Sequence, residues 1–155
     1  MRIAISSDHG GIELKIALVE YIGGLGYDLV DYGTDSEESV DYPDFVLKVG
    51  KAIQDQDVKK GIVICGSGVG VCITANKMKG VYAATCHDIY SATQGVEHDN
   101  MNVLCLGGRV IGIELGKALV KGFLEARFVG QDTGNERHLR RTNKVREIEE
   151  EEMNR

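Results

Sequence analysis

The sequence reads Ile62-Val63-Ile64-Cys65-Gly66-Ser67-Gly68-Val69-Gly70 near the middle of the chain, where an apolar run passes into a run of glycines. The apolar half is typical of a buried strand. The glycine half predicts a loop with few side chains, followed by a helix, and the backbone N–H groups of such a loop can approach an anion closely. The partial positive charge of the helix N-terminus adds to this attraction. The stretch therefore places a thiol, a potential base or nucleophile, beside a cradle for a small oxyanion.

On both sides of this stretch, apolar runs alternate with longer amphipathic segments. Strands are predicted at residues 2–7, 27–31, 61–65, 81–85 and 102–106, and helices at residues 10–25, 42–56, 69–79, 87–96, 111–125 and 143–152. Strict alternation of strands and helices predicts a three-layer α/β/α sandwich around a Rossmann-like, five-stranded parallel sheet whose strand order begins 2-1-3. Ligands of such sheets bind beyond the carboxyl ends of the strands. That rule selects three loops: residues 8–11, residues 65–70 and residues 87–88.

The length and composition fit one soluble domain over residues 1–155. The chain has 155 residues, of which 43% are hydrophobic, enough for a single sizeable core. No apolar run reaches the 18 residues that a transmembrane helix needs. Asp8 follows the first apolar residues too early for a signal peptide, so we expect a cytoplasmic location.

Charge is distributed unevenly along the chain. Five of the 18 basic residues lie within residues 137–146, which contain no acid, so the rest of the chain carries 13 basic residues against all 24 acidic ones. An acidic body of this kind disfavours nucleic acid as a partner. The basic run is either a solvated helix face or an anion site.

The four cysteines show no metal-binding pattern. Cys65, Cys72, Cys86 and Cys105 form no C-x-x-C pair and lack zinc spacing, so no metal is expected. Disulfides are rare in the cytosol. Cys72, Cys86 and Cys105 are interpreted as small core residues, whereas Cys65 adjoins the glycine loop.

Two nucleotide motifs resemble the glycine loop without matching it. Gly66, Gly68 and Gly70 follow a strand and Asp88 lies 20 residues after Gly68, but Val71 occupies the place of the third glycine of a dinucleotide fingerprint. The Gly-Lys-Ser/Thr of a P-loop is also missing. A tight turn without a ligand and a non-catalytic nucleotide-binding module remain as alternatives.

A set of short motifs in order along the chain resembles the ribose-5-phosphate isomerase type B family, which also includes isomerases of allose and galactose 6-phosphates. The matching segments are Ser7-Asp8-His9-Gly10-Gly11, Asp41-Tyr42-Pro43-Asp44, Cys65-Gly66-Ser67-Gly68-Val69-Gly70, Ala75-Asn76-Lys77, His98, Asn102-Val103-Leu104, Gly107-Gly108-Arg109 and Arg137-His138-Leu139-Arg140-Arg141. Each motif is modest alone, but the ordered set is specific.

This resemblance implies an aldose–ketose isomerase that uses neither metal nor cofactor and acts on ribose 5-phosphate, with allose or galactose 6-phosphate as rival substrates. It implies Cys65 as the base, Ser67 as a stabiliser of the enediolate, and His98 with Asp8 as the ring-opening groups. The remaining substrate-binding residues that it implies are His9, Tyr42, Gly66, Gly68, Val69, Gly70, Asp99, Arg109, Arg137 and Arg141. Asp99 departs from the family, many members of which carry Asn directly after the ring-opening His.

The chemistry of these residues agrees with the resemblance. Isomerisation needs a base near C1 and C2 and donors for the developing oxyanion. A thiol serves when positive charge or a helix N-terminus lowers its pKa. Arg137 and Arg141 lie four residues apart, so on a helix they share one face and can hold one phosphate. His9 as a loop residue that caps the first helix, and His87 as a structural residue, are the simpler interpretations of those two side chains.

The resemblance also implies an assembly. It implies a homodimer or a dimer of dimers, a C-terminal helix at about 143–152 that packs on a partner subunit, and an exchange of the last two strands in the sheet. His98 precedes the fifth strand and therefore belongs at the amino edge of the sheet, roughly 16 Å from the carboxyl edge for five residues at 3.3 Å each. We therefore expect an active site shared between two subunits.

Overall fold

The sheet has the predicted architecture. The computed structural model describes all 155 residues. Five parallel strands pair in the order β2-β1-β3-β5-β4, so both the 2-1-3 beginning and the exchange of the last two strands are confirmed. The strands are β1 (Arg2–Ser7), β2 (Asp28–Asp31), β3 (Lys60–Cys65), β4 (Ala83–Thr85) and β5 (Val103–Gly107).

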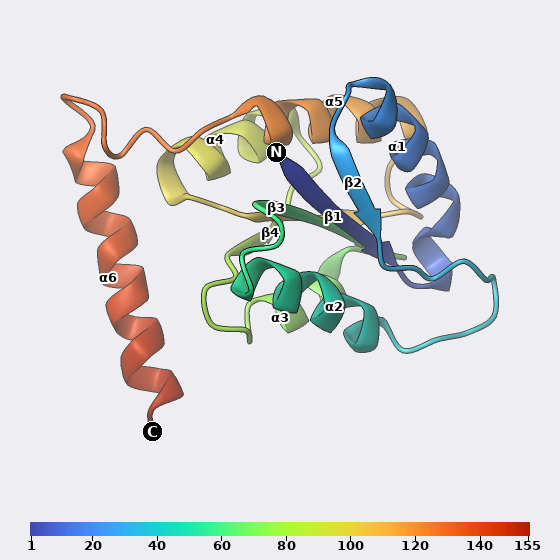
Figure 1. The fold of residues 1–155 in the computed structure, drawn as a ribbon, viewed down its shortest axis with the longest axis horizontal. Helices are drawn as coiled ribbons and strands as arrows, with labels where there is room; N and C mark the ends of the chain where they lie inside the picture. Colours follow the sequence, from blue (N-terminus) through green and yellow to red (C-terminus); the bar gives the residue numbers. More distant parts are fainter.

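Helices cover both faces of this sheet (Figure 1). One face packs against α1 (Ile12–Gly24), α4 (Ile89–Asp99) and α5 (Ile113–Glu125), and the other against α2 (Tyr42–Gln54) and α3 (Val69–Ala75). A short 3-10 helix, η1 (His9–Gly11), precedes α1, and α6 (Glu136–Met153) ends the chain. None of the helices combines the length and the apolar surface that a membrane-spanning helix needs.

Alternation along the central strands divides the core into two clusters. In β3, Ile62 and Ile64 join the cluster under α1, α4 and α5, while Val63 and Cys65 join the one under α2 and α3. Successive residues of a strand point to opposite faces, so a strand buried on both faces is apolar throughout. The same rule sends Cys65 and Cys105 to the α2–α3 face.

Two element boundaries differ from the sequence prediction because of asparagine side chains. The helix predicted over residues 69–79 ends at Ala75, and Asn76 instead pairs with β4: its amide donates to the Ala83 carbonyl at 2.8 Å and accepts from the Ala83 N–H at 2.9 Å. The strand predicted from residue 81 begins at Ala83, since the Tyr82 N–H donates to the Asn102 side chain. Side-chain bonds here replace the backbone pairing that the sequence pattern predicts.

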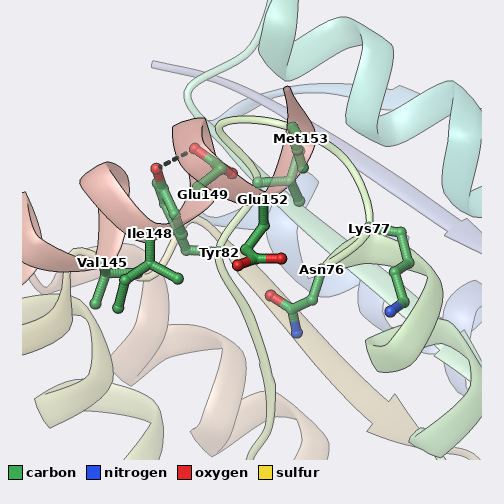
Figure 2. A pocket seen from close by; sticks show the side chains of 9 residues that line it. Asn76, Lys77, Tyr82, Val145, Ile148, Glu149, Glu152 and Met153 are labelled. Atoms are coloured by element: carbon green, nitrogen blue, oxygen red, sulfur yellow. Dashed lines mark hydrogen bonds between the residues drawn. The ribbon is translucent and has the colours of Figure 1, made fainter. Parts of the chain in front are cut away.

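The C-terminal helix is longer than predicted and lies outside both helical layers (Figure 1). It begins at Glu136, not at residue 143, so the whole basic run is helical. Only His138 and Thr142 of this helix are buried, and the His138 ring stacks on His98 with centroids 4.0 Å apart. Farther along, the Glu149 carboxylate accepts from the Tyr82 hydroxyl at 2.9 Å (Figure 2). It also accepts from the Gly80 N–H at 2.9 Å. Two short contact regions therefore attach this helix to the domain.

Two isoleucines of α1 test the assignment of its core face. Ile22 is 0% exposed and Ile16 is 61% exposed. Ile22→Ala should lower the free energy of unfolding by about 2–5 kcal/mol, because it leaves a cavity in the core. Ile16→Ala, the matched control, should change it by about 0.5 kcal/mol or less. Urea unfolding followed by circular dichroism measures both values, and equal losses would contradict the assignment.

Candidate active site

The site is built on the carboxyl end of β3, which delivers Cys65 into the glycine loop. The Gly68 N–H donates a hydrogen bond to the Cys65 Sγ at 3.1 Å, and the Val69 N–H donates to the Ser67 Oγ at 3.2 Å. The Cys65 residue is 5% exposed. The loop therefore places a backbone N–H directly against the sulfur that the sequence predicts as the base.

Three loops interlock around this cysteine. The Gly108 N–H donates to the Cys65 carbonyl at 2.8 Å, and the Arg109 N–H donates to the Gly66 carbonyl at 3.0 Å. From the other side, the Asp8 N–H donates to the Ile64 carbonyl at 3.0 Å. The loops that follow β1, β3 and β5 therefore hold one another in place through their backbones.

The interlock depends on glycine at position 68. Gly68 has a φ of 80°, and a Cβ there would lie 2.9 Å from the Leu106 carbonyl carbon and 3.0 Å from the Gly107 nitrogen. Both the left-handed backbone and the lack of space exclude other residues. Its carbonyl accepts from the Thr85 hydroxyl at 2.8 Å, which ties the loop to β4 as well.

A cavity of about 440 Å³ opens over the loop, and its wall contains much of the predicted site. Asp8 closes one side, and its carboxylate accepts the Gly10 N–H at 2.8 Å. Val110 is the one lining residue without a sequence-based role, although its place directly after the Gly107-Gly108-Arg109 motif could have indicated it. The lining residues are Asp8, Tyr42, Cys65, Gly66, Ser67, Gly70, Arg109 and Val110. Of the predicted loop residues, Gly68 and Val69 do not line it.

A second cavity, of about 310 Å³, adjoins the first through Arg109, which lines both. His9 lines this second space together with Glu13 and Glu37. The Val40 N–H donates to the His9 Nδ1 at 3.2 Å, a contact that the sequence does not indicate. His9 is therefore held by the loop before α2 and does not cap α1.

The other predicted residues form a separate group on α4 and α6. His98 and Asp99 occupy the last turn of α4, and His98 stacks on His138. Arg137 and Arg141 lie on α6, where the Arg137 guanidinium donates to the Gly134 carbonyl at 2.9 Å. Burial, and then the neighbouring His98, lower the pKa of His138. None of these residues lines either cavity beside Cys65.

The other cysteines and His87 lie outside the cavity over the loop. Cys72 was expected in the core but is only partly buried: it packs against the α2–α3 cluster, and its Sγ lies 3.7 Å from the Ala83 carbonyl oxygen and 3.6 Å from the Asn76 amide nitrogen. A hydrogen bond with Cys105 is the main cause that lowers the pKa of Cys72 to about 6, and burial raises the pKa of Cys86 to about 11. His87 accepts the Gly107 N–H on its Nε2 at 3.0 Å, which fits the structural role expected for it.

A third space, of about 440 Å³, lies between α6 and the connection from α3 to β4 (Figure 2). Its apolar walls come from Val145, Ile148 and Met153 of α6 and from Val81 and Tyr82 opposite them. It contains none of the residues for which the sequence predicts chemistry. It results from the way the C-terminal helix stands away from the sandwich.

The chain is similar over nearly its whole length to known sugar-phosphate isomerases. The family model described as Ribose/Galactose Isomerase matches residues 3–145. Ribose-5-phosphate isomerase B of Escherichia coli is 39% identical over 149 residues, covering 96% of this chain and 97% of that protein. D-erythrulose-4-phosphate isomerase of Pectobacterium atrosepticum is 41% identical over 131 residues, covering 84% and 86%.

Solved structures give the same result. Ribose-5-phosphate isomerase B of Clostridium thermocellum superposes with a TM-score of 0.92 at 44% identity, covering 97% of this chain and 99% of that one. The Mycoplasma genitalium enzyme with bound ribulose-5-phosphate superposes with a TM-score of 0.88 at 40% identity, covering 97% of both chains.

Two glycines with the same backbone conformation test the loop. Gly68→Ala should combine the left-handed strain of about 1–2 kcal/mol with displacement of Gly107, and lower kcat by about 10²-fold as the cradle shifts. Gly80 has a φ of 77° with nothing within 4 Å of an added Cβ, so Gly80→Ala carries the strain alone and keeps its activity. Steady-state kinetics gives kcat for both variants, and urea unfolding gives the free energy of unfolding of each. Equal activities would show that the interlock is dispensable.

Proposed function

The chain belongs to the ribose/galactose isomerase family of aldose–ketose isomerases, and we propose that it interconverts ribose 5-phosphate and ribulose 5-phosphate with Cys65 as the base. The observation that carries this proposal is the Cys65 sulfur, held by the Gly68 N–H at 3.1 Å on the wall of a cavity that Asp8 and Ser67 also line. A base, an acid and an oxyanion donor therefore face one space large enough for a pentose phosphate.

The reaction moves one proton between two carbons. The Cys65 thiolate removes the proton from C2 of the open-chain aldose, and the electron pair of that C–H bond forms the C1–C2 double bond of an enediolate. The same thiol then gives the proton to C1, while the proton of the C2 hydroxyl moves to the C1 oxygen. Ser67 and the loop amides stabilise the charge on oxygen, as donors fixed in advance do in other enolising enzymes.

Ring opening and phosphate binding are assigned to the residues on α4 and α6, together with Asp8, His9 and Arg109 from the cavities beside Cys65. His98 would move the proton that opens the furanose, assisted by Asp8, and Arg137 and Arg141 would hold the phosphate with His9 and Arg109. A guanidinium pair binds phosphate through parallel N–H donors, which a lysine does not reproduce. Tyr42 and Asp99 are proposed to contact the sugar hydroxyls, and Gly66 and Gly70 to line the reactive end of the sugar. Gly68 and Val69 act from behind the cavity wall, through their N–H groups on Cys65 and Ser67.

The separation of the two groups supports a homodimer with shared sites. A two-fold axis would bring the partner subunit's His98 and basic helix over the Cys65 loop, and the reverse contact would complete the second site. Exposed apolar side chains near the loop and on α4 fit such an interface, among them Val69, Val110 and Tyr90, which is 73% exposed. In this arrangement α6 packs on the partner.

The choice of sugar is tested by turnover. We expect kcat/KM for ribose 5-phosphate to exceed the values for erythrulose 4-phosphate, allose 6-phosphate and galactose 6-phosphate by about tenfold or more, because one sugar carbon more or less misplaces the phosphate against C1 and C2. A coupled assay on all four sugar phosphates measures this. A higher value for any of the other three would reassign the substrate.

The same assay includes two cysteine variants. Cys65→Ala should lose about 10²–10⁴-fold in kcat, the usual loss for a positioned general base. Cys86→Ala, at a buried cysteine outside the cavity, is the matched control and should keep its turnover. Near-normal turnover by a folded Cys65→Ala protein contradicts the base role. Saturable nucleotide binding without isomerisation would favour the non-catalytic module.

Mixing two inactive variants tests the shared site. Equal amounts of Cys65→Ala and His98→Ala chains, allowed to exchange subunits, should regain about a quarter of wild-type activity, since half of the dimers are mixed and each has one complete site. Cys65→Ala mixed with Ser67→Ala is the control and should regain none, because both residues belong to the same half-site. Mixed dimers, verified by native mass spectrometry, that stay inactive would place all catalytic residues in one chain.

A further inference from the structure

The proposed reaction gives no role to a buried lysine, Lys15, and to the two carboxylates that it binds. Lys15 of α1 is 1% exposed and is the largest fully buried side chain of the protein. Its Nζ lies 3.0 and 2.9 Å from the two carboxylate oxygens of Asp31 and 3.0 Å from the Asp35 Oδ1. A buried ammonium group is unfavourable unless it is paired and hydrogen-bonded. The buried Lys15 ammonium is therefore stabilised by its ion pairs with Asp31 and Asp35, and it holds both carboxylates in place.

Both carboxylates belong to the segment that leads from β2 to α2. Asp31 also accepts the Gly33 N–H at 2.8 Å, and the Thr34 N–H donates to the Ser7 carbonyl at 2.6 Å, directly before Asp8. After Asp35, residues 36–39 are exposed. Lys15 thus fastens the base of an otherwise exposed loop to α1, while the Thr34–Ser7 bond fastens it to the carboxyl end of β1.

The far end of this loop, at Val40, fixes which ring nitrogen of His9 carries the proton. The Val40 N–H donates to the His9 Nδ1 at 3.2 Å, so that nitrogen carries no proton. In a neutral imidazole the proton then resides on Nε2, which becomes the donor. His9 lines the cavity that adjoins the Cys65 cavity through Arg109.

We propose that Lys15 is a positioning residue: through Asp31 and Asp35 it holds the Val40 N–H against His9, and so sets the imidazole tautomer that presents an Nε2–H donor to the substrate's phosphate. This rests on the role proposed above for His9. Lys15 acts through its ion pairs with Asp31 and Asp35 and then through the Val40 N–H on His9. No atom of Lys15 touches the substrate. The consequence for the reaction is in substrate binding, not in the proton transfer at C1 and C2.

Three variants separate positioning from a purely structural role. Lys15→Met with Asp31→Asn removes the tether without leaving an unpaired buried charge. Asp35→Asn weakens it at a side chain that is 89% exposed, so the fold tolerates the change. Val40→Pro removes the donor N–H and leaves Lys15 intact. Lys117→Met, at an exposed pair with Glu114, is the control for loss of a lysine on the same domain.

The readout is the tautomer of His9, measured on the full-length protein by long-range ¹H–¹⁵N NMR at a pH where the ring is neutral. The wild type and Lys117→Met should show a bare Nδ1 and a protonated Nε2. The double variant and Val40→Pro should show a mixture of tautomers, with Asp35→Asn between them. KM for ribose 5-phosphate should rise about tenfold in the double variant, as for loss of one hydrogen bond to a charged group, with kcat nearly unchanged.

A folded double variant that keeps the wild-type tautomer would overturn the proposal, whatever Val40→Pro shows. A folded Val40→Pro protein that keeps the tautomer would overturn it as well, because the Val40 N–H would then not set the tautomer. The tautomer is read without substrate, so it decides the role of Lys15 even where the assignment of His9 fails. That assignment has its own test: His9→Ala with an unchanged KM would remove His9 from the phosphate site.

Discussion

Close backbone contact between the loops after β1, β3 and β5 is the constraint on which the site depends. Cys65 pairs in register with Gly107, and the Gly108 N–H donates to the Cys65 carbonyl. Side chains would hold these loops apart, which is why glycines occupy the contact points. The same lack of side chains lets the Gly68 and Val69 N–H groups reach the Cys65 sulfur and the Ser67 hydroxyl, so that their positive ends point at the reactive side of the loop. One feature therefore gives both the rigidity and the anion cradle of the site.

The strand order makes this contact possible. Because β5 lies next to β3 and β4 is moved to the edge, the loop after β5 and not the one after β4 meets Cys65. The displaced β4 still contributes from the edge, where the Thr85 hydroxyl binds the Gly68 carbonyl and His87 accepts the Gly107 N–H. An unexchanged order would place Thr85 and His87, rather than Gly107 and Arg109, beside the cysteine. Topology thus decides which side chains surround the thiol.

The sequence predicts the sheet better than the connections. Apolar runs such as 2–7 and 61–65 give the strands, since burial on both faces leaves a clear pattern. The start of α6 was missed because residues 136–142 are mostly charged and the helix buries only His138 and Thr142. Lys15 was missed because a charged residue in an amphipathic helix normally faces solvent, and its partners lie 16 and 20 residues away. The motif residues at the carboxyl edge were found, and the order of strands and helices also predicted that His98 lies apart from them, as its place in the last turn of α4 agrees. The pattern does not show that Arg137 lies on a helix outside the sandwich.

Charge gives a physical reason for dividing the site between two elements. The body that carries Cys65 is acidic, and Glu13 and Glu37 line the cavity beside His9, so a phosphate there meets carboxylates with only His9 and Arg109 to offset them. The basic residues lie instead on α6, which stands outside the helical layers (Figure 1). In the proposed dimer, the partner's helix supplies the missing positive charge at each cradle. A lone subunit would then hold its substrate weakly, so assembly and substrate binding would reinforce each other through linkage. Activity in such an enzyme depends on protein concentration for an electrostatic reason as well as for a geometric one.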